Sequence, residues 1–145
     1  VDTSALIDGR IAKICETGFL GGALVIPRFV LDELQRIADS GDPLRHARGR
    51  RGLEVLAELR KIRNLDVRIH DSDVGRRTEI DAKIVFIAQA LKAKLLTTDY
   101  NLAKMAEFHG VPWLNLNTLA RALRPEHMLG ETVEVDLVKA GKEEG

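Results

Sequence analysis

Strand-like and helix-like segments alternate along almost the whole chain, and this alternation restricts the fold more than any other feature. Short apolar, β-branched runs are separated by stretches in which apolar residues recur with a helical period. The strand-like runs are residues 1–3, 23–26, 66–70, 94–97 and 112–116, and the helical ones are 9–16, 29–39, 48–63, 79–93, 102–109 and 118–123. The order predicts an α/β fold, a three-layer α/β/α sandwich with a central parallel sheet.

Composition narrows the setting of this fold. The 145 residues suit one compact domain with a core of its own. Lysine and arginine (22) balance aspartate and glutamate (22), so any attraction to nucleic acid must come from local patches. Cys15 is the single cysteine, so no internal disulfide can form; this fits a reducing compartment, and we expect the domain to be cytoplasmic.

The C-terminal tail differs from the rest. Residues 1–124 carry the strand–helix alternation, whereas residues 131–137 alternate strictly between polar and apolar side chains. We therefore expect a domain at 1–124, followed at 125–145 by a linker and the truncated start of a separate β-domain.

Two acids lie at or just after the ends of predicted strands. Asp2 lies in the strand-like run 1–3, and Asp99 comes just after the run 94–97. In open α/β sheets, ligands bind beyond the carboxyl ends of the strands, so both residues can reach such a site. An acid at a strand-to-helix turn can equally cap the next helix, and the sequence leaves both interpretations open.

Two further acids lie on predicted helices. Glu33 shares a helical face with the apolar residues Val30, Leu34 and Ile37. A carboxylate there needs a partner, which can be an arginine, water at the edge of the stripe, or a functional site. Asp81 lies in the first turn of its helix, where the helix dipole alone favours an acid, but its spacing also places it on the inward stripe.

Asp2, Glu33, Asp81 and Asp99 converge if the fold is as predicted. Two unit charges ~5 Å apart at an effective dielectric of ~20 repel by roughly 3 kcal/mol, so the cluster requires a cation. Ligands that are all oxygen select hard ions, which predicts Mg²⁺ or Mn²⁺. The four histidines are scattered, which disfavours zinc.

Four sequence blocks carry a resemblance. VDTSALID (1–8), IPRFVLDEL (26–34), EIDAKI (79–84) and LTTDYNL (96–102) look like the signature blocks of PIN-domain nucleases, in family order. The sequence Asp8-Gly9-Arg10 and the β-like tail more specifically resemble the bacterial PIN–TRAM subgroup.

The resemblance implies a site and an activity. Asp2, Glu33, Asp81 and Asp99 would be the catalytic ligands of one or two Mg²⁺ or Mn²⁺ ions, with Thr98, Asn101 and Asp8 as supporting polar residues. The implied activity is hydrolysis of single-stranded RNA by metal-activated water, by an endoribonuclease.

The resemblance also implies partners in the same chain. The tail would begin a TRAM-like RNA-binding domain. Some relatives carry upstream membrane helices, so a full-length protein would be membrane-anchored by an upstream segment. The metal-assisted chemistry does not itself select RNA over DNA.

Two arginine runs are candidate phosphate contacts. Arg45, Arg48, Arg50 and Arg51 form one run, and Arg76 and Arg77 precede Asp81. Such side chains give salt-sensitive, sequence-independent affinity, although an ordinary solvated helix face is an equal alternative for the first run.

Other functions compete with this hypothesis. A PIN-like module that binds RNA or a partner without cutting would retain the same fold. A haloacid-dehalogenase-type phosphatase would require Asp-x-Asp after the first strand, where this chain has Asp2-Thr3-Ser4. A phosphoacceptor receiver leaves no role for Glu33. A homodimer is also expected, because the 53–59 helix and the Phe29 region can present apolar surface.

Overall fold

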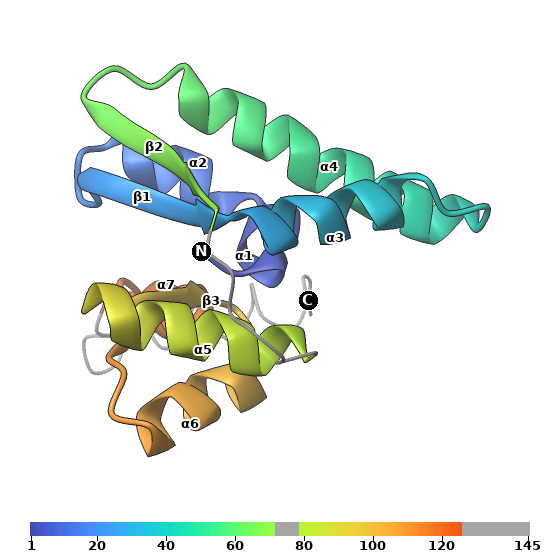
Figure 1. Ribbon diagram of the computed structural model, residues 1–145. Helices are drawn as coiled ribbons and strands as arrows, with labels where there is room; N and C mark the ends of the chain where they lie inside the picture. Colours follow the sequence, from blue (N-terminus) through green and yellow to red (C-terminus); the bar gives the residue numbers. More distant parts are fainter. Residues whose placement is uncertain (72–78, 126–145) are drawn as a thin grey trace, which may run out of the picture.

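The computed structural model of the chain describes residues 1–71 and 79–125. Figure 1 shows the elements in their spatial arrangement. The helices are α1 (Thr3–Asp8), α2 (Arg10–Glu16), α3 (Arg28–Ala38), α4 (Pro43–Arg60), α5 (Ile80–Leu91), α6 (Tyr100–Phe108) and α7 (Leu116–Ala122). The strands are β1 (Gly22–Pro27), β2 (Leu65–His70), β3 (Leu95–Thr97) and β4 (Trp113–Asn115).

The strands form two parallel pairs. β1 pairs with β2 from Gly22↔Leu65 to Pro27↔His70, and β3 pairs with β4 from Leu95↔Trp113 to Thr97↔Asn115. Val1 and Asp2 lie between the pairs, because the Val1 amino group donates to the Val25 carbonyl (2.9 Å) and the Asp2 amide donates to the Leu96 carbonyl (3.0 Å). These two residues therefore join both halves of the sheet layer.

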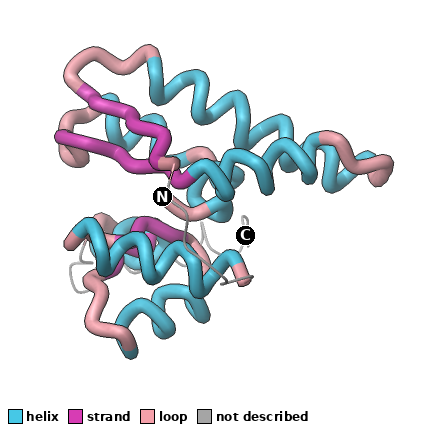
Figure 2. The backbone as a smooth tube through the Cα atoms, viewed as in Figure 1, coloured by secondary structure: helices cyan, strands magenta, loops and turns pink. Residues whose placement is uncertain are grey.

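Helices cover the strands to give the expected α/β/α sandwich. α1, α2 and α4 pack against one another, while α5 and α6 contact each other and β3. α3 and α4 form an antiparallel hairpin that extends away from the strands (Figure 2). Fully buried aliphatic side chains from both halves form one core, among them Leu6, Ile26, Leu34, Leu59 and Leu95.

The α3–α4 hairpin depends on a close backbone approach at Gly49. A Cβ added at Gly49 would lie 2.2 Å from the Ala38 backbone nitrogen. Glycine at this point lets the two helices pack with their backbones almost in contact.

Several predicted boundaries were wrong. Residues 1–3 were expected to be strand, but only Asp2 is extended before α1 begins at Thr3. Helix α1 was missed because it is short; it ends at Gly9, whose φ of 89° is the left-handed conformation that glycine favours. α4 begins at Pro43 rather than at 48, with proline at a position where its missing N–H costs nothing.

Some expectations fall outside the described residues. Arg76, Arg77 and nearly all of the 125–145 tail lie there, so the predicted linker and truncated β-domain stay predictions. Within residues 1–71 and 79–125, no helix is long and apolar enough to cross a membrane.

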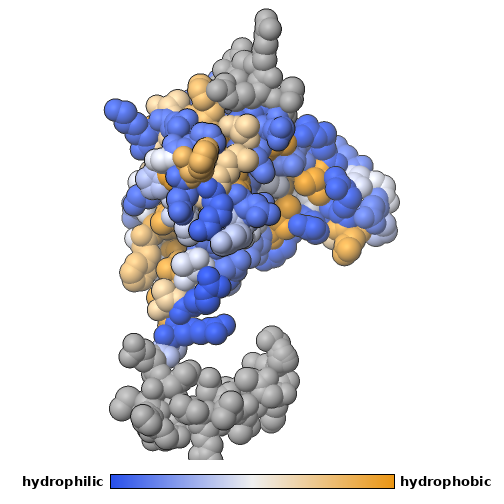
Figure 3. All heavy atoms as spheres, turned by 90° about the horizontal axis from the view of Figure 1, so that it is seen from below, coloured by the Kyte–Doolittle hydropathy of each residue, from blue (hydrophilic) through white to orange (hydrophobic). Residues whose placement is uncertain are grey.

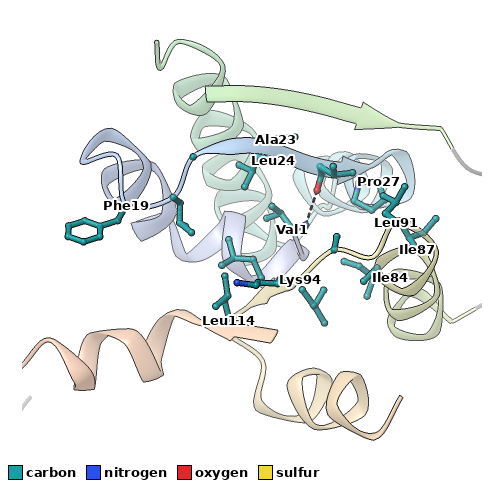
Figure 4. Close-up of a pocket in the computed structure, with 17 residues that line it drawn as sticks. Val1, Phe19, Ala23, Leu24, Pro27, Ile84, Ile87, Leu91, Lys94 and Leu114 are labelled. Carbon is teal, nitrogen blue, oxygen red and sulfur yellow. Dashed lines mark hydrogen bonds between the residues drawn. The ribbon is translucent and has the colours of Figure 1, made fainter. Parts of the chain in front are cut away.

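An apolar cavity of about 420 Å³ lies between the two strand pairs. Val1, Leu24, Ile84, Ile87 and Leu114 point into it (Figure 4), and Lys94 is the only charged side chain that the described residues contribute to its lining. The cavity extends toward the amino ends of β1 and β3, where these strands are not hydrogen-bonded to each other. No carboxylate of residues 1–71 or 79–125 lines it, so the chemistry of the acids must be sought at the opposite edge of the sheet layer.

Candidate metal centre

Asp2 is the buried member of the acidic group. Its side chain is 6% exposed, and Oδ2 accepts hydrogen bonds from Ser4 Oγ (2.7 Å) and Thr97 Oγ1 (2.8 Å). Oδ1 accepts no hydrogen bond from a described residue, and within the described ranges no fully buried side-chain oxygen lacks a partner. Oδ1 is therefore open to solvent and free to act as a ligand.

Two hydroxyls that the sequence analysis did not single out orient Asp2. Thr97 is completely buried at the end of β3, and its Oγ1 accepts from the Asp99 amide (2.9 Å) while donating to Asp2. Ser4 Oγ accepts from the Thr98 amide (3.1 Å). The hydroxyls thus tie Asp2 to the backbone of the turn that carries Asp99. The sequence offered one signal for Thr97: it is the polar residue at the end of β3, a strand that is otherwise apolar and buried. A buried hydroxyl needs a hydrogen-bond partner, so Thr97 could have been expected to contact a polar site.

Asp99 is a helix cap with one oxygen to spare. Oδ1 accepts from the amides of Asn101 (2.9 Å) and Leu102 (3.3 Å) at the start of α6. Oδ2 accepts no hydrogen bond from any described residue. The capping and ligand interpretations are thus compatible, because each uses a different oxygen of Asp99.

Glu33 has a hydroxyl partner rather than a cation. Its Oε1 accepts from Thr3 Oγ1 (2.6 Å), which connects α3 to the start of α1. Val30 and Leu34 on the same face are buried, while Glu33 is only partly buried. No arginine or lysine of the described residues forms an ion pair with it.

Asp81 lies in the combined field of the other acids. Burial first, and then the negative charges of Asp2, Asp99, Glu33 and the adjacent Glu79, raise the pKa of the Asp81 carboxyl above its usual range. Its side chain is nevertheless exposed and accepts no hydrogen bond from a described residue. The placement on the buried stripe is therefore correct for Ile84, Val85 and Ala88 but not for Asp81 itself.

Asp2, Asp99 and Glu33 lie near enough to Asp81 for their charges to act on it, but the four carboxylates do not form a finished ligand cage. No three His, Cys, Asp or Glu side chains of the described residues are close enough together to hold a metal ion as they stand. The donors are nonetheless all oxygens, and Asp2, Asp99 and Glu33 each keep one oxygen that accepts no hydrogen bond from a described residue. In donor chemistry the set fits a hard divalent cation, which would draw the free oxygens together.

The remaining predicted polar residues lie around this group in different ways. The Thr98 amide and the Asn101 amide enter the network described above, whereas neither side chain forms a hydrogen bond with a described residue. Asp8 lies at the other end of α1 from Asp2, with its carboxylate paired to Arg10 (2.8 Å).

A family comparison agrees with the geometry. The model of the PIN domain family matches residues 1–108, a range that contains all four acids. The chain belongs to the PIN domain family. PIN domains are generally metal-dependent nucleases.

Relatives of this PIN domain carry further domains. It is 48% identical over 143 residues to an uncharacterized PIN and TRAM-domain containing protein, YacL, of Bacillus subtilis, covering 99% of this chain and 39% of that protein. A similarly described protein of Thermus thermophilus is 47% identical over 143 residues, again 99% of this chain and 42% of the relative. An uncharacterized KH and PIN-domain containing protein of Methanocaldococcus jannaschii is 36% identical over 121 residues, or 72% of this chain and 18% of the relative.

These matches support the bacterial PIN–TRAM resemblance. The PIN domain described here spans about two fifths of the length of the first two relatives. In structure, it is similar to a domain of a functionally unknown protein of Methanocaldococcus jannaschii, with a TM-score of 0.66 and 25% identity over 90% of this chain and 93% of that domain.

The predicted arginine run lies on the α3–α4 hairpin of the PIN domain. Arg45, Arg48, Arg50 and Arg51 are exposed on α4, and none forms an ion pair with a described residue.

The face drawn in Figure 3 is largely hydrophilic, with smaller hydrophobic patches. The most exposed large apolar side chains, Phe19 and Phe108, lie on different parts of the chain, and the homodimer stays a prediction.

Proposed function

We propose that this PIN domain hydrolyses phosphodiester bonds of single-stranded RNA with Mg²⁺ or Mn²⁺ at the site of Asp2, Glu33, Asp81 and Asp99. The observation that supports the proposal most is the buried Asp2 carboxylate, which the Ser4 and Thr97 hydroxyls hold beside the turn that carries Asp99. Within the described part of the chain no lysine or arginine pairs with these acids, and such clustered negative charge costs folding free energy that a bound divalent ion would offset.

The residues would divide the work in a simple way. Asp2, held by Ser4 and Thr97, and Asp99, held as the α6 cap, would be fixed ligands, each through the oxygen that accepts no hydrogen bond from a described residue. Asp81 lacks such restraints and can adjust its position. The bound ion would supply an activated water and neutralise charge that develops on the phosphate. No nucleophilic side chain is required.

The other domains found in relatives of this PIN domain favour RNA as the substrate. Relatives carry TRAM or KH domains, which are RNA-binding modules, in the same chain. We further propose that the cleavage is endonucleolytic. We also propose that the PIN domain is cytoplasmic and belongs to a longer protein that is anchored in a membrane.

A second candidate is an RNA-binding PIN module that does not cut. It is favoured by one observation, that the carboxylates of the described residues are not arranged as a ready ligand set. This module would still bind RNA but would show no metal-dependent turnover.

Cleavage of an end-labelled single-stranded RNA in Mn²⁺ tests the proposal. We expect the wild-type chain to cut, and Glu33→Gln and EDTA each to abolish cutting. Asp32→Asn is the matched control, because Asp32 is the exposed neighbour of Glu33 on α3 and forms no hydrogen bond or ion pair within 4 Å with a described residue. RNA binding without cleavage by the wild type would favour the second candidate. Equal loss in Asp32→Asn and Glu33→Gln would contradict the assigned site.

A further inference from the structure

Arg10, at the start of α2, is held on two sides. Its Nε and Nη2 donate to the two carboxylate oxygens of Asp8, at 2.8 and 2.9 Å. Nη2 also donates to Asn117 Oδ1 on α7, at 2.6 Å. A guanidinium in such a two-pronged arrangement is fixed in orientation as well as in position.

This guanidinium lies at the same edge of the sheet as the acids. Thr97, which donates to Asp2, is the register partner of Asn115 in the neighbouring strand β4. Asn115 in turn accepts from the amides that begin α7, including that of Asn117 (2.8 Å). Arg10 is therefore one strand and one helix turn away from Asp2.

Arg10 keeps donors for a further partner. A guanidinium has five N–H groups, and the bonds to Asp8 and Asn117 use those on Nε and Nη2. Nη1 donates to no described residue, and the side chain is 41% exposed. Two oriented N–H groups thus remain free at the surface.

Arg51 keeps this group of side chains positively charged, because the charges of Asp8 and Arg10 alone would cancel each other. Its Nη2 is 3.5 Å from the Asp8 carbonyl oxygen, and its guanidinium lies against Gly9. Burial alone would raise the pKa of Asp8, but the hydrogen bonds of Arg10 and the charges of Arg10 and Arg51 outweigh it and hold the pKa below its usual range. The group of Asp8, Arg10 and Arg51 therefore carries a net charge of about +1 at neutral pH.

We propose that Arg10, with Arg51 beside it, binds a backbone phosphate of single-stranded RNA next to the acidic site. The inference rests on the proposed function for its substrate class. Arg10 on α2 would thus add a fixed phosphate contact to those expected from the arginines of α4. The Asp8–Arg10 pair would have the role of positioning the RNA strand. A purely structural tie between α2 and α7 is the alternative.

Fluorescence anisotropy of a labelled oligouridylate, in EDTA and at several salt concentrations, tests the proposal. We expect Arg10→Ala to weaken binding about tenfold, as for loss of a hydrogen bond to a charged group. The slope of log affinity against log salt should fall by about 0.7 for the lost phosphate contact. Arg60→Ala is the matched control, because Arg60 is exposed and unpaired among described residues at the far end of α4.

Two further variants separate binding from folding. Arg10→Lys keeps the charge but cannot form the two-pronged contact, and should bind RNA with intermediate affinity. Asn117→Ala keeps the pair with Asp8 and should bind nearly as well as wild type. Melting temperatures show which variants are folded.

The outcomes also separate this proposal from the nuclease proposal. Equal affinities and salt slopes for Arg10→Ala and Arg60→Ala, both folded, would leave Arg10 a structural role and overturn the inference even if the wild type cuts RNA. A wild-type chain with no RNA affinity at low salt would overturn it too. Weaker binding by Arg10→Ala in a chain that never cuts would support the phosphate contact and reject only the nuclease.

Discussion

At the scale of single residues, the site combines fixed and mobile acids. Asp2 and Asp99 are each held through one oxygen, Glu33 is held by Thr3, and Asp81 has no described partner. Pre-organised ligands lower the cost of binding an ion, whereas one mobile ligand lets the shell adjust to it. Mutual repulsion in the metal-free state should therefore be felt most clearly at Asp81.

Asp81→Asn is expected to stabilise the metal-free protein slightly. Solvent screens this exposed carboxylate, so the gain should be on the order of the ~0.2–1 kcal/mol known for exposed charge pairs. The sign with pH follows from the raised pKa: the folded state holds this proton more tightly than the unfolded state, so wild-type stability falls as pH rises through that pKa. Thermal melts in EDTA across the acidic range should show the variant losing this part of the pH dependence. A less stable variant at neutral pH would contradict the repulsion.

Thr97→Val is expected to lower the free energy of unfolding by about 1–3 kcal/mol, because it leaves the Asp99 amide and one lone pair of Asp2 without their partner. It should also weaken any Mn²⁺-dependent cleavage, since Asp2 loses a restraint. Thr98→Val is the comparison for stability, because the Thr98 hydroxyl bonds to no described residue. Urea denaturation of both variants measures the difference, and equal stabilities would refute the role given to Thr97.

At the scale of elements, the sequence predicted the kinds of helices and strands better than their limits. Every predicted strand from 23–26 onward corresponds to β1, β2, β3 or β4, because apolar β-branched runs between turn residues have few other solutions. The short helix α1 escaped notice because its six residues span less than two turns. Ala57 and Leu91 continue the apolar stripes of their helices and are nevertheless exposed, since the ends of apolar stripes run past the layer they cover.

The residues of the candidate site were also predicted only in part. Strand ends indicated Asp2 and Asp99, and an acid within an apolar face indicated Glu33. The hydroxyls of Ser4 and Thr97 were not found, because serine and threonine at a strand end are common and only tertiary structure brings Ser4 from α1 to Thr97 from β3.

Gly49→Ala tests the helical hairpin. A Cβ would meet the Ala38 backbone, so we expect a loss of about 1–3 kcal/mol of stability from overpacking, despite the better helix propensity of alanine. Gly41→Ala, where nothing lies within 4 Å of the added Cβ, should be nearly neutral. Chemical denaturation of the two variants measures both effects. A stable Gly49→Ala protein would mean that α3 and α4 can separate without cost.

At the scale of the whole molecule, two chemically different regions occupy opposite edges of one sheet layer. The carboxyl ends of the strands carry the acids, with arginines on the adjoining helices α2 and α4. The amino ends enclose the apolar cavity around Val1. Because Val1 and Asp2 connect both strand pairs, the position of Asp2 depends on the assembly of the whole fold.

A bound ion should therefore stabilise the entire domain. Ligand at one hundred times its dissociation constant adds about 2.7 kcal/mol to the free energy of unfolding. This linkage gives a readout of the metal site that is independent of RNA and of turnover.

The most direct test of the acidic site is a Mn²⁺ titration followed by the electron paramagnetic resonance signal of the free ion. We predict saturable binding to the wild type, binding at least tenfold weaker in Glu33→Gln and in Asp81→Asn, and wild-type affinity in Asp32→Asn. Affinity should also fall in acid as Asp81 takes up its proton. Mn²⁺ binding that is equally strong in all four proteins, or absent from the wild type, would contradict a single metal site built from these carboxylates.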